Sequence, residues 1–202
     1  MTTNTASLPT LATTLWPVAG DTARNRELLR AVVLALAGSV LMTLSAKIQI
    51  PFWPVPLTMQ TFVVLVLGMA YGWRLGAATM MLYLVEGACG LPVFAGTPEK
   101  GIGLAYMVGP TGGYLVGFVL AAALCGWLAE RGWDRSIVRV AIAMLIGHAL
   151  ILGLGTAWLS SLVGIEKGIQ FGLTPFWTAT ILKTALAMAA LPLAWQFAGK
   201  RR

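Results

Sequence analysis

Long apolar runs, separated by short polar segments or by segments rich in glycine and proline, make up most of this chain. A helix that crosses a bilayer needs about 20 mostly apolar residues, because each residue rises about 1.5 Å across a hydrocarbon core of about 30 Å. Six runs meet or approach that length and predict an all-α, polytopic membrane protein. The predicted spans are residues 28–46, 57–71, 75–87, 111–129, 137–163 and 175–198.

The segments between the predicted spans are not all ordinary polar turns. Pro51, Pro54 and Pro56 interrupt the segment before the second span. Residues 88–110, between the third and fourth spans, are rich in glycine and proline. Unpaired backbone groups are costly in hydrocarbon, so this loop is expected to lie at the interface, fold over the protein or line a cavity.

Basic residues predict the orientation of the spans. With the N-terminus inside, ten of the fourteen Lys and Arg residues lie on the inner side. Lys47, Lys100 and Lys167 lie on the outer side, and Lys183 lies within a span. By the positive-inside rule, this bias predicts that both termini lie in the cytoplasm, with an even number of spans. The ten inner residues are Arg24, Arg26, Arg30, Arg74, Arg131, Arg135, Arg139, Lys200, Arg201 and Arg202.

Composition supports a lipid environment and excludes a nucleic-acid-binding role. Apolar residues make up 58% of the chain and charged residues only 10%, whereas soluble domains carry about 25% charged residues. The net charge of +7 comes from residues at segment ends, with no basic stripe interleaved with stacking aromatics. Residues 1–27 are expected to form a flexible cytoplasmic tail, and residues 28–202 one transmembrane substrate-binding domain.

Lys183 is the residue that most directly suggests a binding site. It lies eight positions after Pro175, at a depth from which its ammonium group does not easily reach water. Ionisable residues inside a membrane are costly and commonly functional, although a lysine paired purely for packing is the alternative. Thr180 and Phe176 precede it by one and two helical turns, so the three side chains are expected to share a face that lines a pocket.

Three further features are candidates for chemistry or docking. Glu86 ends the third span on the outer side, where it either pairs with Lys183, accepts ligand N–H groups, or points into water. His148 is the single histidine, and a lone histidine in a span is more often bonded between helices than a ligand. Ala31 and Ala35 form a small-xxx-small pair suited to close packing of another helix.

Four ordered motifs carry a resemblance to a known family. They are PVPLTMQT at 54–61, YLVEGACGLPVFAG at 83–96, GPTGGYLVGF at 109–118 and PFWTATILK at 175–183. Together they resemble the BioY family, which supplies the substrate-binding S component of energy-coupling factor transporters for biotin. The third motif lacks the Lys-Ser/Thr of a phosphate-binding P-loop, so this chain is not expected to hydrolyse ATP itself.

The resemblance implies high-affinity capture of biotin and its uptake across the cytoplasmic membrane. The implied partners are a transmembrane coupling subunit, which the Ala31 and Ala35 strip would meet, and two ATP-hydrolysing subunits; no cofactor is implied. Lys183 would bind the carboxylate or the ureido oxygen of biotin, while Phe94, Tyr114 and Phe176 would pack its rings and chain. Residues 88–110 would form an outer lid.

One position departs from the family pattern. An aspartate usually stands three residues before the lysine of the last helix, and here that position is Thr180. If the aspartate normally accepts the ureido N–H groups, then the Thr180 hydroxyl, or Glu86 from the outer rim, must take that role.

Two other function classes fit the sequence less well. A self-sufficient secondary transporter for biotin or another small vitamin would be expected to show inverted repeats or a continuous path of charged residues, and the sequence shows neither. An intramembrane enzyme would need a metal-ligand cluster or a nucleophile beside a base, and the sequence offers neither.

Overall fold

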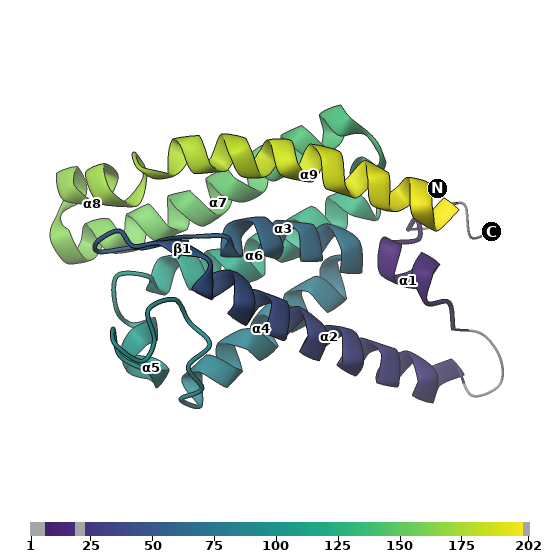
Figure 1. The fold of residues 1–202 in the computed structure, drawn as a ribbon, viewed down its shortest axis with the longest axis horizontal. Coiled ribbons are helices and arrows are strands. Elements are labelled where there is room, and N and C mark those ends of the chain that lie inside the picture. Colours follow the sequence, from purple (N-terminus) through teal and green to yellow (C-terminus); the bar gives the residue numbers. More distant parts are fainter. Residues whose placement is uncertain (1–6, 19–22, 200–202) are drawn as a thin grey trace, which may run out of the picture.

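The computed structural model describes residues 7–18 and 23–199 (Figure 1). Lys200, Arg201 and Arg202, which contribute to the predicted orientation, lie outside the described residues, as do 1–6 and 19–22 of the predicted tail. Of the described residues, 76% are helical. Its helices are α1 (Leu11–Leu15), α2 (Ala23–Lys47), α3 (Gln60–Tyr71), α4 (Trp73–Ala88), α5 (Gly103–Met107), α6 (Gly112–Ala129), α7 (Ile137–Val163), α8 (Ile165–Gly172) and α9 (Phe176–Gly199), with a 3-10 turn, η1 (Trp133–Arg135), before α7.

Four helical stretches are long and apolar enough to cross a membrane by length and composition. They are Arg24–Lys47, Gly112–Ala129, Ile137–Val163 and Ile165–Gly199. The expectation of a helical membrane protein with several spans is therefore confirmed. With 12 and 16 residues, α3 and α4 would extend only about 18 and 24 Å at 1.5 Å per residue. The count of six spans stays a prediction.

A short antiparallel ribbon precedes α3 in this mostly helical protein, at the start of the predicted second span. β1 (Gln49–Ile50) pairs with β2 (Leu57–Thr58), and α3 begins at Gln60 rather than at residue 57. Pro51, Pro54 and Pro56 lie in the connection between the two strands. Because proline has no backbone N–H, it does not continue a regular helix there. Pairing the two strands satisfies backbone groups that an irregular segment would leave unpaired at membrane depth.

Helix α6 lies at the centre of the bundle and contacts α3, α4 and α7. In Figure 1, α7 and α9 run along one side of the molecule and α2 along the other, with α3 and α6 between them. Glycines permit the close approach of α6 to its neighbours. A Cβ atom added at Gly117 would lie 2.9 Å from the Ile151 Cα of α7. The close contact between α6 and α7 therefore depends on glycine, which has no side chain, at position 117.

The described part of the predicted tail is packed against the helices, which corrects the expectation of a flexible segment through residue 27. Helix α1 contacts α3 and α9, and its Leu11 is buried. The Leu8 N–H donates to the Glu130 carbonyl at 2.8 Å. Helix α2 begins at Ala23, four residues before the predicted boundary of the tail.

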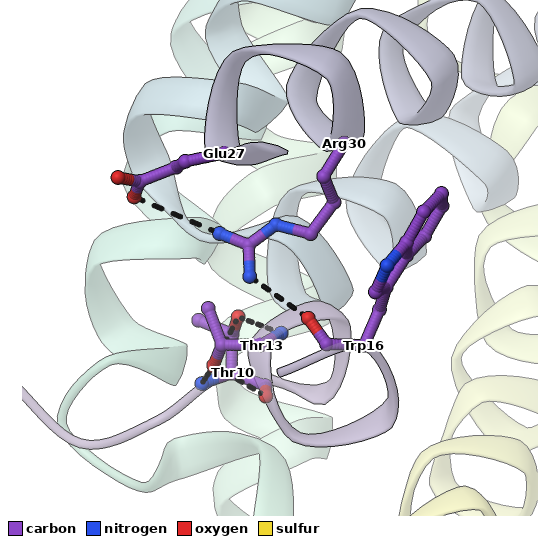
Figure 2. A network of polar contacts seen from close by, with 5 residues as sticks. All are labelled: Thr10, Thr13, Trp16, Glu27 and Arg30. Carbon is purple, nitrogen blue, oxygen red and sulfur yellow. Dashed lines mark hydrogen bonds and ion pairs between the residues drawn. The ribbon is translucent and has the colours of Figure 1, made fainter. Parts of the chain in front are cut away.

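Polar contacts join α1 to the start of α2 (Figure 2). A capping box begins α1, in which the Thr10 hydroxyl accepts from the Thr13 N–H and the Thr13 hydroxyl accepts from the Thr10 N–H. The Arg30 Nη1 donates to the Trp16 carbonyl at 2.9 Å, and Arg30 also pairs with Glu27 at 3.8 Å. These contacts satisfy both ends of a helix only five residues long.

The loops divide between two ends of the molecule. Helix α1 lies beside the end of α9, while α5, α8 and the ribbon lie at the opposite end (Figure 1). The two ends of the described chain therefore lie together, as an even number of crossings requires. Their location in the cytoplasm stays a prediction.

A large side chain introduced at the α6–α7 contact is expected to lower the stability of the protein. Gly117→Leu should destabilise the protein by about 1–3 kcal/mol, because the two backbones must separate to admit it. Gly153→Leu on α7 is the matched control, since nothing lies within 4 Å of a Cβ at that position. Its midpoint of thermal unfolding in detergent should be unchanged or raised, because leucine favours helix over glycine. Equal midpoints for the two variants would contradict the close contact.

Candidate functional site

Lys183 lies inside the bundle and is held by two oxygen atoms. Its side chain is buried, with 6% of the residue exposed. The Nζ atom donates to the Thr58 carbonyl at 2.6 Å and to the Thr61 hydroxyl at 2.8 Å. No carboxylate in the described part of the chain forms an ion pair with it. The ammonium group is therefore solvated by neutral dipoles and keeps capacity for an anionic or carbonyl partner.

The last helix has one buried face. Phe176, Thr180, Lys183 and Ala187 are all buried, at intervals of one helical turn along α9. This face points towards the start of α3, where Thr58 and Thr61 receive the lysine.

A cavity lies beside this contact and brings together three of the residues predicted to bind ligand. Phe94, Tyr114 and Phe176 line it, together with Thr58 and Thr61. It holds about 440 Å³ of empty space, open solvent included, of which about 30 Å³ is accessible to the centre of a water molecule. The cavity is thus a narrow slot between side chains. Its other lining residues are Val55, Pro56, Gln60, Ala95, Tyr106, Thr111, Leu115 and Phe118.

Aromatic rings form the walls of this slot. Tyr114 on α6 stacks with Phe176 on α9 at 5.9 Å between ring centroids, and the Tyr114 hydroxyl donates to the Gly172 carbonyl at 2.7 Å. Phe94 stacks on Tyr106 at 4.9 Å. Such walls suit a flat, mostly apolar ligand.

A second cavity, with about 700 Å³ of empty space, open solvent included, is lined by Lys183 itself. Its lining is almost entirely apolar and includes Ile48, Ile50 and Leu182, whose side chains are exposed on the surface of the helical bundle. Thr58, whose carbonyl accepts from the Lys183 Nζ, lines both cavities, whereas the second acceptor, Thr61, and the aromatic rings line only the first. We therefore assign the ligand site to the first cavity.

A chain of hydrogen bonds extends from the lysine contact, through residues that the sequence analysis did not select. The Thr58 hydroxyl donates to Gln60 Oε1 at 3.2 Å, and Gln60 Nε2 donates to the Tyr83 hydroxyl at 2.8 Å. Tyr83 in turn donates to the Val93 carbonyl at 3.0 Å. The polar residues of PVPLTMQT, at the start of an apolar run, were the available signal for Thr58, Gln60 and Thr61.

Residues 88–110 supply one wall of the cavity and include helix α5. The Tyr106 hydroxyl donates to the Ala95 carbonyl at 2.7 Å. Burial raises the pKa of this hydroxyl, so it keeps its proton and remains a donor. This hydrogen bond joins two parts of the loop and stabilises the backbone next to Phe94.

The structure does not bring Glu86 to the cavity. Its carboxylate accepts a hydrogen bond from the Ser39 hydroxyl of α2, and it neither lines the slot nor pairs with Lys183. His148, which the sequence analysis set aside, donates from Nδ1 to the Met144 carbonyl at 2.8 Å. Ala31 and Ala35 are half-buried, and Ala31 lines a separate cavity beneath α1.

The arrangement is suited to binding. The lining offers hydroxyl and amide groups and aromatic rings, but no Asp or Glu among the residues that the structure describes there. Across the described chain, no group of three or more His, Cys, Asp and Glu residues could hold a metal ion.

Comparisons with known proteins agree with this geometry. The chain is 38% identical over 170 residues to a biotin transporter BioY of Thermotoga maritima, covering 83% of this chain and 95% of that protein. It is 36% identical over 148 residues to a probable biotin transporter BioY of Pyrococcus horikoshii, covering 73% and 85%. Its fold matches that of a solved S-component for biotin from an ECF-type ABC transporter, with a TM-score of 0.72, 22% identity, and coverage of 85% and 94%.

The family model described as the BioY family matches residues 12–200, nearly the whole chain. All four motifs singled out in the sequence lie within this match and contribute residues to the wall of the slot, and the fourth also carries Lys183. The chain belongs to the BioY family.

Proposed function

We propose that this protein captures biotin and supports its uptake as the substrate-binding S component of an ECF-type transporter. The observation that carries the proposal is a buried, unpaired lysine whose two acceptors line a slot walled by aromatic rings. Family membership and the names of the relatives give the substrate. The test is equilibrium binding of biotin to the detergent-purified protein, with thiamine and riboflavin as controls.

The chemistry of biotin fits the groups at this site. Biotin has a carboxylate, a ureido ring with two N–H donors and one carbonyl, and an apolar body. Lys183 supplies the cation for the carboxylate or the ureido oxygen. Phe94, Tyr114 and Phe176 supply flat apolar surfaces, and hydroxyl groups supply acceptors for the ureido N–H groups.

The narrow slot implies that its walls part when ligand enters. Only about 30 Å³ is open to the centre of a water molecule, which is far less than a bicyclic ligand needs. Loops that cover a binding site commonly rearrange when the ligand enters or leaves. In this protein, residues 88–110 form a wall of the slot that lies outside the long helices and contains only the short helix α5.

The proposed membrane context follows the sequence analysis. The protein lies in the cytoplasmic membrane with both termini inside, and it works with a transmembrane coupling subunit and two ATP-hydrolysing subunits. Uptake into sealed vesicles that contain this protein alone would instead favour a self-sufficient secondary transporter.

Removal of the lysine amine should weaken ligand binding directly. Lys183→Met keeps most of the apolar stem and should raise the Kd for biotin at least about tenfold, the low end for a charge-assisted hydrogen bond. Lys167→Met, at an exposed position on α8, is the matched control and should leave the Kd unchanged. Unchanged affinity together with a lowered midpoint of thermal unfolding would make Lys183 a purely structural tether.

The Glu86 carboxylate is engaged by Ser39, so we propose that the Thr180 hydroxyl, rather than Glu86, takes the place of the family aspartate. Glu86→Gln should change the Kd for biotin by less than about threefold, in wild type and in a Thr180→Asp background alike. A double-mutant cycle measures this. A coupling above about 0.5 kcal/mol would show that the two positions share the role.

We place the contact with the coupling subunit at the strip formed by Ala31 and Ala35, where small residues on α2 admit another helix. An open groove with about 1040 Å³ of empty space, open solvent included, lies beside Ala31, beneath α1. Either alanine changed to Trp should leave biotin affinity within about threefold but abolish co-purification with the coupling subunit and ATP-dependent uptake. Ala78→Trp, at an exposed position on α4, is the control. Intact complex and normal uptake in both strip variants would contradict the assignment.

A further inference from the structure

Residues 94–97 are attached to the helical body by one lysine outside the site described above. Lys47 is the last residue of α2, and its Nζ donates to the Phe94 carbonyl at 3.1 Å, the Thr97 carbonyl at 3.2 Å and the Thr97 hydroxyl at 3.3 Å. Three acceptors match the three donors of an ammonium group. Lys47 precedes Phe94 by 47 residues and Thr97 by 50 residues, so the contact joins the loop to a helix that is distant in sequence.

The carbonyl that Lys47 holds belongs to a residue that walls the cavity. Phe94 is 1% exposed, and its ring stacks on Tyr106 and meets Tyr83 edge-on at 5.4 Å. The ring occupies the space above Gly87 of α4, where an added Cβ would lie 2.0 Å from the Phe94 Cζ. A shift of the 94–97 backbone therefore moves a wall of the ligand slot.

We propose that Lys47 is a positioning residue for ligand retention: its ammonium group fixes residues 94–97 against α2 and so keeps Phe94 closed over the ligand. This inference rests on the proposed function, because the retained ligand is the one that Lys183 binds. Lys47 does not line the cavity, so it acts on the ligand through Phe94.

The geometry favours an effect on dissociation over an effect on folding. A second contact, from Tyr83 to the Val93 carbonyl, keeps the loop attached to α4 when Lys47 is removed. Lys47 is also largely exposed, so its loss leaves no buried cavity. Removal of the Lys47 ammonium group takes away three hydrogen bonds to residues 94–97 but leaves the packing of the Phe94 ring in the core in place.

The experiment compares Lys47→Met with Lys100→Met in the full-length, detergent-purified protein. Lys100 lies in the same loop, and its ammonium group has no hydrogen-bond partner among the residues that the structure describes. Lys47→Met should speed biotin dissociation by about tenfold and Lys100→Met by less than about twofold, since only the first removes charged hydrogen bonds. Midpoints of thermal unfolding should be similar for both.

Hydrogen exchange of the 94–101 amides, measured without ligand, supplies a readout that does not depend on the proposed function. Lys47→Met should speed this exchange and leave the helices protected. Thr97→Val should give a smaller acceleration of biotin dissociation and add little in the Lys47→Met background.

Unchanged exchange and dissociation in Lys47→Met would overturn the inference, as would equal effects of Lys100→Met or full additivity with Thr97→Val. Faster exchange in a protein that binds no biotin would instead refute the proposed function while leaving the attachment of the loop in place.

Discussion

The structure depends on how an ammonium group is accommodated inside an apolar membrane protein. A charge at that depth is tolerated only when oxygen atoms replace its water. Lys183 finds them at the Thr58 carbonyl and the Thr61 hydroxyl, on either side of the residue where α3 begins. The same contact therefore fixes the last helix against the start of α3, and it requires an interruption of regular helix there. The ribbon of β1 and β2 provides that interruption with its backbone paired.

The rest of the site follows from this contact. Because Thr58 is fixed by the lysine, its hydroxyl is free to donate to Gln60, which continues the polar chain to Tyr83 and to the backbone of Val93. A line of polar groups thus runs from the last helix to the loop at 88–110, through a protein that is otherwise apolar. Thr58 and Thr61, which accept from the cation, line one part of the slot, and Phe94 of the loop lines another. The hydrogen bonds thus connect the lysine contact physically to the loop.

Hydropathy was sufficient to predict much of the fold but little of the detailed contact geometry. The bounds of α7 were predicted correctly, since a long apolar run ends where glycine begins a turn. The start of α3 was predicted three residues early, because strand pairing by β2 depends on partners seven and nine residues away that hydropathy does not reveal. Helix α1 was missed because its packing comes from contacts with α3 and α9 rather than from a long apolar pattern of its own. Of the site residues, the face of α9 followed from helical periodicity, whereas the direction of Glu86 depended on a serine 47 residues away.

Close packing and cationic attachment divide the molecule into parts of unequal stiffness. Glycines bring the backbone of α6 against its neighbours, and any separation there opens the packed core. Residues 94–97 are held both by hydrogen bonds from the exposed Lys47 and by the packing of the Phe94 ring in the core. The proposed entry of ligand past Phe94 therefore requires two changes, the loss of these hydrogen bonds and the movement of the ring away from Tyr83 and Tyr106.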